Sequence, residues 1–401
     1  MGRLQVFALI ACIGTVSLST FGQYYVAHGD AGVTAGQQIQ AGTSAGGIGT
    51  LTQVSGTFDL RNSTAGNAVL VGTSGAWGSL HFVDGLIQLN DADAFAVGLA
   101  TEQAASRGNA SVVQIGGRIE MACQDAGTTF QIGGSDDASF SAVTGDYTLQ
   151  GGQIALTNVD MYVGAFSAYN NARNVGTFSM LNGSFTHTGS LSIGIAGGQG
   201  IANITGGAFS AGSMYVGASE WDGPGKSDAT LKVGRAADFS AQDLTLYATA
   251  DSAWGNDVEL AVQLAGLNDH TVMDIAGGFS IGNVYAGSDP SNPAYKMPIL
   301  TVELLGAFAP QLGDEFVIGH AGSFQTVDPF TGALAAGVLD FASIASTLPL
   351  SNPAWMWSTR VDNGTDLVLY VMQPAAMVIP EPATLVLLGL GGLAMLRRRP
   401  W

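Results

Sequence analysis

Four aspartates are the best candidates for catalysis in this chain of 401 residues. Asp136 and Asp137 are adjacent, and Asp91 and Asp93 occupy a similar turn segment one repeat earlier. A pair of carboxylates is typical of a glycoside hydrolase, and converging carboxylates with a basic residue are typical of a calcium-dependent polysaccharide lyase. Because both pairs fall in turn segments, we interpret them as solvated loop charges.

The other residue types that support catalysis are scattered. Arg118 and Arg235 are the candidate basic partners, and each stands alone at its turn. The five histidines form no pair at metal-ligand spacing, and Cys123 has no neighbouring cysteine. The sequence also lacks a nucleophile elbow, a phosphate loop and a nucleotide fingerprint. We therefore predict no catalytic residue, metal or cofactor, with a polysaccharide-active β-helix enzyme (lyase or glycoside hydrolase) as the alternative.

A membrane-related pattern occupies the last part of the sequence. It consists of an entry triplet, a short uncharged run and a basic cluster: Pro380, Glu381 and Pro382; residues 383–396; and Arg397, Arg398 and Arg399. The run is short for a membrane span, which needs about 20 residues, but the arginines hold the following end in the cytoplasm. We expect everything before the run to lie outside the membrane.

This order of triplet, apolar run and arginines resembles the PEP-CTERM sorting signal of Gram-negative bacteria. The resemblance rests on VIPEPATL at 378–385, on LGLGGL at 388–393 and on the basic cluster. It implies that an exosortase, a membrane-embedded cysteine transpeptidase, recognises the triplet and removes the helix. It also implies a link to exopolysaccharide or biofilm. An ordinary tail anchor is the alternative, although such an anchor does not need a Pro-Glu-Pro entry.

The N-terminal residues predict export. A basic residue precedes the apolar stretch 4–18, which is followed by small residues, as in a secretory signal peptide. We predict cleavage between Gly22 and Gln23, with cleavage after Ala27 as the alternative. A lipid-modified Cys12 is a further alternative, because it ends a lipobox-like Leu-Ile-Ala-Cys.

Composition restricts the partners and the means of stabilisation. Residues 23–379 hold nine basic against thirty acidic residues, which disfavours nucleic acid and anionic lipid as partners. After signal removal only Cys123 remains, so no intramolecular disulfide can form. The chain is 47% hydrophobic with 57 glycines, which indicates a folded protein with many turns rather than a disordered one.

An approximate repeat indicates a solenoid. Alternating apolar residues, a turn, a second short strand and an apolar-x-apolar-Gly closer recur from seven starts: Gly56, Gly78, Gly108, Gly145, Gly176, Gly200 and Asp228. In one copy Phe178 and Met180 share a face, Asn182 and Gly183 turn the chain, and Phe185 opens the next strand. Stacked copies would bury a continuous apolar ladder. We predict a parallel β-helix, with hairpins of an antiparallel sandwich as the alternative.

Longer alternating strands replace the repeat from residue 256. This part resembles the C-terminal segment beside autotransporter-like repeats in many PEP-CTERM proteins, and we read it as a β-sandwich-like cap over the last coil. The predicted protein is therefore all-β, with hydrophobic helices at both termini. Its predicted parts are a signal peptide (1–22), an N-terminal cap (23–55), β-solenoid repeats (56–255), a β-rich C-terminal cap (256–372), a linker (373–379) and the sorting signal with its transmembrane segment (380–401).

The predicted function is that of an exported, non-catalytic protein of the cell envelope or extracellular matrix. It would be held transiently in the inner membrane by its C-terminal helix and then processed by an exosortase, with exopolysaccharide as a partner. A carbohydrate-binding surface module is another alternative. Trp77, Trp221 and Trp254 are its candidate sugar-stacking residues, although packing in the core or at a coil edge is the favoured role for them.

Overall fold

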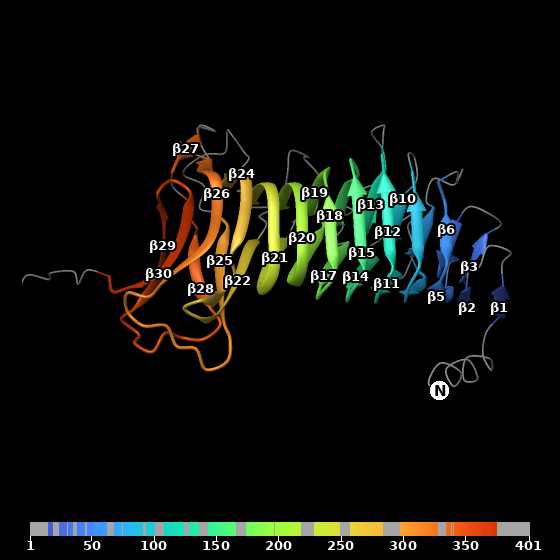
Figure 1. Cartoon of the computed structure of the whole chain (residues 1–401), viewed down its shortest axis with the longest axis horizontal. Helices are drawn as coiled ribbons and strands as arrows, with labels where there is room; N and C mark the ends of the chain where they lie inside the picture. The colour runs from blue at the N-terminus through green and yellow to red at the C-terminus, as the bar shows by residue number, and fades with distance from the viewer. Residues whose placement is uncertain are drawn as a thin grey trace, which may run out of the picture.

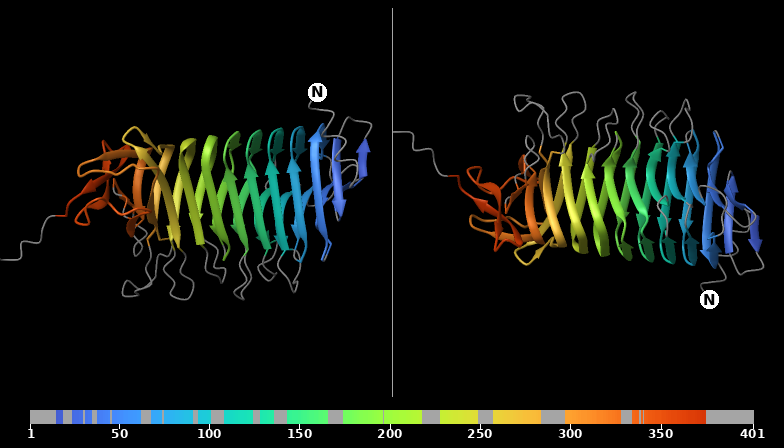
Figure 2. Two further views of the ribbon diagram at one scale, coloured as in Figure 1. Left: turned by 90° about the horizontal axis from the view of Figure 1, so that it is seen from below. Right: turned by 90° about the horizontal axis from the view of Figure 1, so that it is seen from above.

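The computed structural model shows a β-solenoid, with its coils stacked along the long axis (Figures 1 and 2). It describes residues 15–18, 24–29, 31–34, 38–44, 46–61, 68–73, 75–90, 94–100, 108–123, 128–135, 143–165, 174–195, 197–217, 228–248, 257–283, 297–327, 334–337, 339 and 341–374. All regular elements among these residues are β-strands. Within this part of the chain, no helix is both long and apolar enough to cross a membrane.

Each coil has three faces, and each face is a ladder of parallel strands. The first face contains β5 (Ile48–Ser55), β8 (Trp77–Phe82), β11 (Gly108–Gln114), β14 (Val143–Leu149), β17 (Val175–Met180), the first parts of β20 (Gln199–Gly217) and β21 (Asp228–Ala248), β22 (Val258–Gly266), β25 (Ile299–Leu304) and β28 (Ser343–Ser346). The parallel pairing confirms the solenoid and excludes the alternative of antiparallel hairpins for these strands.

The second and third faces follow in the same chain order. The second contains β6 (Thr57–Asp59), β9 (Leu86–Leu89), β12 (Arg118–Ala122), β15 (Gln153–Thr157), β18 (Ser184–His187), the middle of β20 and β21, the start of β24 (Met273–Asn283) and the middle of β26 (Glu315–Val327). The third contains β4 (Gln38–Ala41), β7 (Val69–Thr73), β10 (Ala94–Ala100), β13 (Thr129–Ser135), β16 (Asp160–Ala165), β19 (Ser190–Ile195) and the last parts of β20, β21, β24 and β26.

The corner between the first and second faces has the same form in four successive coils. Segments 83–85, 115–117, 150–152 and 181–183 connect the two faces in successive coils. Each ends in a glycine with positive φ: Gly85 (111°), Gly117 (71°), Gly152 (83°) and Gly183 (92°). Such φ values disfavour residues with a Cβ, so glycine fixes where the chain turns onto the second face. The turn predicted at Asn182 and Gly183 is one of these corners.

The corner between the third face and the next coil varies in length but also depends on glycine. Gly164 has φ +65°, and a Cβ there would lie 1.9 Å from the carbonyl oxygen of Gln199. On the other side, a Cβ on Gly176 would lie 2.2 Å from the backbone nitrogen of Gly164. Closing glycines therefore let the backbone of one coil pack directly against the starts of the next two. The connections that follow range from three residues, as at 196–198, to fifteen residues at 284–298.

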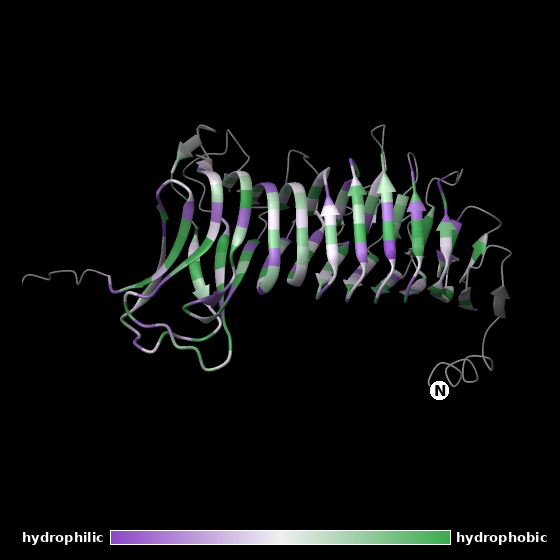
Figure 3. Cartoon of the chain, in the orientation of Figure 1, coloured by the Kyte–Doolittle hydropathy of each residue, from purple (hydrophilic) through white to green (hydrophobic). Residues whose placement is uncertain are grey.

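The core is a set of columns that run along the axis of the solenoid. Alternate residues of each strand point inward, which gives the alternating colours of Figure 3. On the second face the buried rings of Phe185, Phe209 and Phe239 stack at centroid distances of 4.8 and 5.1 Å. On the third face Phe95 and Phe130 stack at 4.7 Å. Burial of each such ring contributes about 1.5–3 kcal/mol.

The predicted repeat is recovered with three shifts of register. Phe178 and Met180 are both buried, and they pair with Ala202 and Ile204 of the next coil, as the pattern predicts. The residue of the first coil that pairs with Gly78 is Gly49 rather than Gly56, which forms a first corner. In the third coil the equivalent position is Ala110 rather than Gly108, and in the seventh it is Ala229 rather than Asp228.

Antiparallel strands lie at the N-terminal end of the stack. β1 (Thr15–Leu18) pairs with β2 (Tyr24–Gly29), β2 pairs with β5, and β3 (Ala31–Thr34) pairs with β4. β1 thus falls within the residues predicted to be the signal peptide, and it is a strand where a hydrophobic helix was expected. The rest of that predicted helix, and the whole of the C-terminal one, lie outside the described residues.

The stacking continues through much of the segment expected to be a separate cap. β22, β24, β25 and β26 extend the three parallel ladders beyond residue 256. Antiparallel pairing is added by β23 (Asp269–His270), β27 (Leu334–Ala336), β29 (Met356–Asp362) and β30 (Asp366–Met372). A β-sandwich is thus not seen among the described residues of 256–372. The long alternating strands were recognised, but most of them stack in parallel as further coils instead of forming an antiparallel sandwich.

Candidate functional site

The residues predicted to direct sorting and cleavage lie outside the part of the chain that the structure describes. This holds for the sorting triplet Pro380, Glu381 and Pro382, for the basic cluster Arg397, Arg398 and Arg399, and for Gly22 and Gln23 at the predicted cleavage bond. It holds also for both aspartate pairs and for Trp221 and Trp254. The described body leads to the sorting segment through β30, which ends at Met372.

The sequence indicated that each candidate catalytic arginine stands alone. In the structure, each of them contacts a carboxylate. Arg118 forms an ion pair with Glu120 at 2.7 Å, and Glu120 also accepts a hydrogen bond from Gln88 of the preceding coil. Arg235 contacts Asp269, 34 residues further along the chain, at 2.6 and 2.8 Å. Arg118 is therefore held by a carboxylate two residues along its own strand, and Arg235 by one that stacking brings close.

Seven of the described carboxylates on the outward surface contact a basic side chain. The pairs and their shortest distances are Asp59–Arg61 (2.6 Å), Glu120–Arg118 (2.7 Å), Asp269–Arg235 (2.6 Å), Glu303–Lys232 (2.6 Å), Glu315–Arg360 (2.7 Å), Asp362–Arg360 (2.8 Å) and Asp366–His320 (2.9 Å). Hydrogen bonds from Arg61, Arg360 and His320 hold the pKa of Asp59, Glu315 and Asp366 below their ordinary values. A general acid in glycoside hydrolysis needs a raised pKa, so these three carboxyl groups are unsuited to that role.

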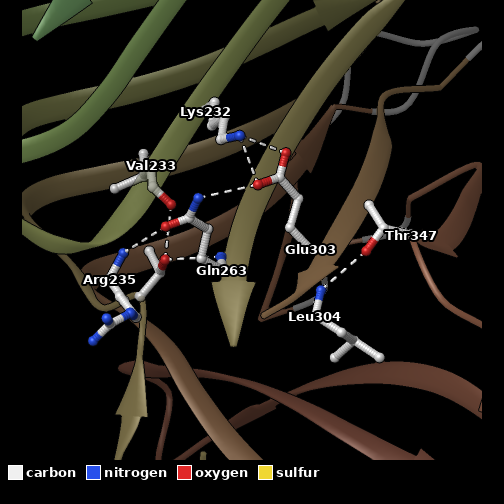
Figure 4. A network of polar contacts seen from close by, with 8 residues as sticks. Lys232, Val233, Arg235, Gln263, Glu303, Leu304 and Thr347 are labelled. Carbon is white, nitrogen blue, oxygen red and sulfur yellow. Dashed lines mark hydrogen bonds and ion pairs between the residues drawn. The ribbon is translucent and has the colours of Figure 1, made fainter. Parts of the chain in front are cut away.

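A bridge of three polar side chains spans three coils on the first face (Figure 4). The ammonium group of Lys232 on β21 contacts both carboxylate oxygens of Glu303 on β25, at 2.6 and 2.7 Å. The amide of Gln263 on β22 lies between them and donates a hydrogen bond to Glu303 at 3.1 Å. We call Lys232, Gln263 and Glu303 the polar bridge. Its groups satisfy one another, which fits a clamp between coils better than a binding site.

The histidines occupy unrelated environments. His28 is exposed on β2, whereas His320 contacts Asp366 at the C-terminal end. His187 is 2% exposed inside the core, where Nε2 lies 2.7 Å from the carbonyl oxygen of Val159 and the ring stacks on Phe185. Burial lowers the pKa of His187 below 6.5. Among the described residues, no group of three or more His, Cys, Asp or Glu side chains could hold a metal ion.

Trp77 and Cys123 are two further residues that the sequence analysis singled out. Trp77 is 57% exposed at the start of β8, where packing in the core or at a coil edge had been favoured. Cys123 is 4% exposed and lies in the core cluster, so it is a packing residue in this fold.

Sequence reasoning missed an uncharged surface where the chain leaves the body. Segments 305–313 and 347–355 begin together, because the hydroxyl of Thr347 accepts a hydrogen bond from the backbone N–H of Leu304 at 3.1 Å. They also end together, on β30: Gly313 donates to the carbonyl of Val371 at 3.0 Å, and Met356 is the register partner of Met372. Leu312, Leu348 and Met356 are 48%, 46% and 46% exposed. We call these two segments and Met356 the exit surface.

Comparison with known proteins identifies the C-terminal pattern. The PEP-CTERM protein-sorting motif matches residues 378–399, which include the triplet and the basic cluster. Comparison of the whole chain with curated protein sequences gave no match. The motif implies an exported protein that is anchored in the membrane before an exosortase processes it. The chain therefore combines a PEP-CTERM protein-sorting motif with a β-solenoid body.

Proposed function

We propose that this protein is a non-catalytic component of the cell surface or extracellular matrix, with exopolysaccharide as its partner. Residues 383–396 would hold it in the membrane until the exosortase acts at Pro380–Glu381–Pro382. The observation that carries the proposal is the PEP-CTERM motif at 378–399 behind a long solenoid. A body of stacked coils suits an extended structural role, because each coil contacts mainly its neighbours and presents three long outer faces.

Two features of the outer faces support a structural role over catalysis. The carboxylates of the described ion pairs are engaged by cations, as set out above, and a lyase or hydrolase needs acid and base groups that are free to meet the substrate. Outward positions of the third face carry hydroxyl groups, including the partly exposed Tyr215 and Thr245, which are register partners in successive coils. Tyr215 also lies parallel to Tyr247, at a centroid distance of 6.4 Å. Hydroxyl groups and aromatic rings suit contacts with sugars.

The sorting part is tested by mass spectrometry of the protein from its own host, with and without the exosortase. We expect peptides from 383–396 to be lost only when the exosortase is present. Glu381→Gln should reduce this loss, because it alters the triplet, whereas Glu259→Gln on β22 is a matched control that should be processed normally. An intact C-terminal segment in both strains would rule out exosortase processing.

The role of the body is tested by incubating the purified protein with exopolysaccharide from the same host. We expect retention on the polysaccharide without new reducing ends or unsaturated products. Release of such products in proportion to protein concentration would show an enzyme and overturn the non-catalytic part of the proposal.

A further inference from the structure

The exit surface differs in charge from the rest of the body. Residues 305–313 and 341–359 contain no Asp, Glu, Lys or Arg, whereas the whole chain carries a net charge of −18. The first charge after 305–313 is Asp314, whose carboxylate already accepts a hydrogen bond from the backbone of Gln311 at 2.7 Å. This contrast matters near a membrane, because an acidic surface is repelled by anionic lipid and an uncharged one is not.

Within the β29–β30 hairpin itself, the charged residues lie away from the exit surface. There Asp362 pairs with Asp366 in register, and His320 contacts Asp366. The chain leaves the hairpin from the other end, at Met372, beside Met356. The hairpin is thus polarised, with its uncharged end facing the direction in which the chain continues toward the sorting motif.

The exit surface is packed firmly enough to keep its form. Phe308 of the first segment contacts Phe316 edge-on at 5.9 Å, and Phe316 contacts Trp357 at 6.1 Å. Phe316 and Trp357 are buried, while Phe308, Leu350 and Trp355 pack against the core and stay partly exposed. The exposed Leu312, Leu348 and Met356 are therefore presented by anchored segments.

The length of chain between the body and the apolar run limits their separation. Ten residues, 373–382, connect Met372 to the run that begins at residue 383. A fully extended chain spans at most about 3.3–3.6 Å per residue, so the exit surface lies within about 35 Å of the inserted run. Apolar side chains held so close to a bilayer gain free energy when they enter its interface.

We propose that the exit surface contacts the lipid–water interface of the membrane while residues 383–396 are still inserted. The contact uses Leu312, Leu348 and Met356 and holds the solenoid end-on to the bilayer. This inference rests on the proposed function, since it requires the sorting segment to be in the membrane. Removal of that segment by the exosortase would end the tethering and release the body.

The test measures how closely chosen residues approach lipid. The full-length chain is reconstituted into phosphatidylcholine vesicles, with a bimane label on Leu312→Cys or Met356→Cys and with doxyl-labelled lipid as quencher. Leu181→Cys is the matched control, because Leu181 is a similarly exposed leucine (51%) at a corner in the middle of the solenoid. The unsubstituted chain, labelled in the same way, gives the background from the native cysteines.

We expect bimane at positions 312 and 356 to be quenched at least twofold more than at 181. The pair Leu312→Glu and Leu348→Glu should bring quenching at 356 down to the control level while the chain still floats with the vesicles. A chain that does not float shows that membrane insertion, and with it the proposed function, has failed. A chain that floats with equal quenching at all three positions overturns this inference alone. Energy transfer between labelled copies without lipid quenching would assign the exit surface to a second copy and also overturn it.

Discussion

At the scale of single residues, two kinds of position carry the most weight in this fold. One is the closing glycine, where a neighbouring coil occupies the space that a Cβ would need. The other is a buried titratable side chain, of which His187 is the clearest case. Both are set by packing between coils, so both give predictions that separate packing from local backbone preference.

Gly164→Ala should destabilise the solenoid by about 2–5 kcal/mol, the sum of backbone strain and overpacking. The new Cβ would meet the carbonyl oxygen of Gln199 at 1.9 Å, and φ is +65°. Gly306→Ala is the matched control, because Gly306 has φ +64° with no atom within 4 Å of the added Cβ. It should cost about 1 kcal/mol. Urea unfolding followed by circular dichroism measures both, and equal losses would show that coil contact is not the cause.

His187 should make the stability of the body depend on pH. Burial lowers its pKa in the folded state below the ordinary value of 6.5, so the unfolded chain binds more protons as the pH falls. The free energy of unfolding should therefore be undiminished above pH 6.5, decline below it, and stop declining once the pH passes the folded pKa. Melting temperatures between pH 7.5 and 5 for the protein and for His187→Leu provide the measurement.

The leucine variant should lose part of this acid sensitivity, because it has no imidazole to protonate. The core should accept leucine there, since Leu156 occupies the same inward position one coil earlier. His28→Gln is the control, since His28 is exposed. If His187→Leu and the unmodified protein lose the same stability with pH, the burial of His187 is not what makes the body acid-sensitive.

At the scale of elements, coils are joined by ladders of backbone hydrogen bonds, by stacked rings and by outward polar contacts. Among the described contacts, the polar bridge joins the residues that are furthest apart in sequence, since Lys232 and Glu303 are separated by 71 positions. Its side chains are 26% and 21% exposed, which protects the ion pair from part of the solvent screening.

A double-mutant cycle on Lys232→Met and Glu303→Gln should give a coupling of about 1 kcal/mol, reduced by added salt. The same cycle on Arg61 and Asp59, which are 47% and 43% exposed, should give a smaller coupling. Urea midpoints at low and high salt measure both. A coupling at the polar bridge no larger than that of the exposed pair would show that it does not clamp the coils.

At the scale of the whole molecule, the features set by local patterns could be predicted from the sequence, whereas long-range pairing could not. The alternation in each strand and the glycine corners are local, so the solenoid and pairs such as Phe178 and Met180 could be read from the sequence. Glycines at different corners look alike in sequence. Gly56 and Gly108 were therefore chosen as repeat starts, although Gly49 and Ala110 are the residues that pair in register with Gly78.

The partners of strands and charges are less visible. The alternating strands beyond residue 256 were recognised, but an alternating strand suits a sandwich as well as a coil, and only the fold decides between them. Arg235 contacts Asp269 because the two residues lie in adjacent coils. No short sequence motif encodes such a relation. The sorting signal was readable because it is a contiguous motif. The exit surface was not, because hydrogen bonds to Thr347 and Val371 bring its two segments together.

The unequal corners have a consequence for how such a protein can change over time. The corner between the first and second faces keeps one length in the four coils from 83–85 to 181–183, whereas the connection after the third face ranges from 196–198 to 284–298, and the ladders stay in parallel register on either side. New sequence can therefore be added along a single edge without displacing any strand from its partners. That edge gives natural selection, or an engineer who grafts peptides, a place to diversify the surface at little cost to folding.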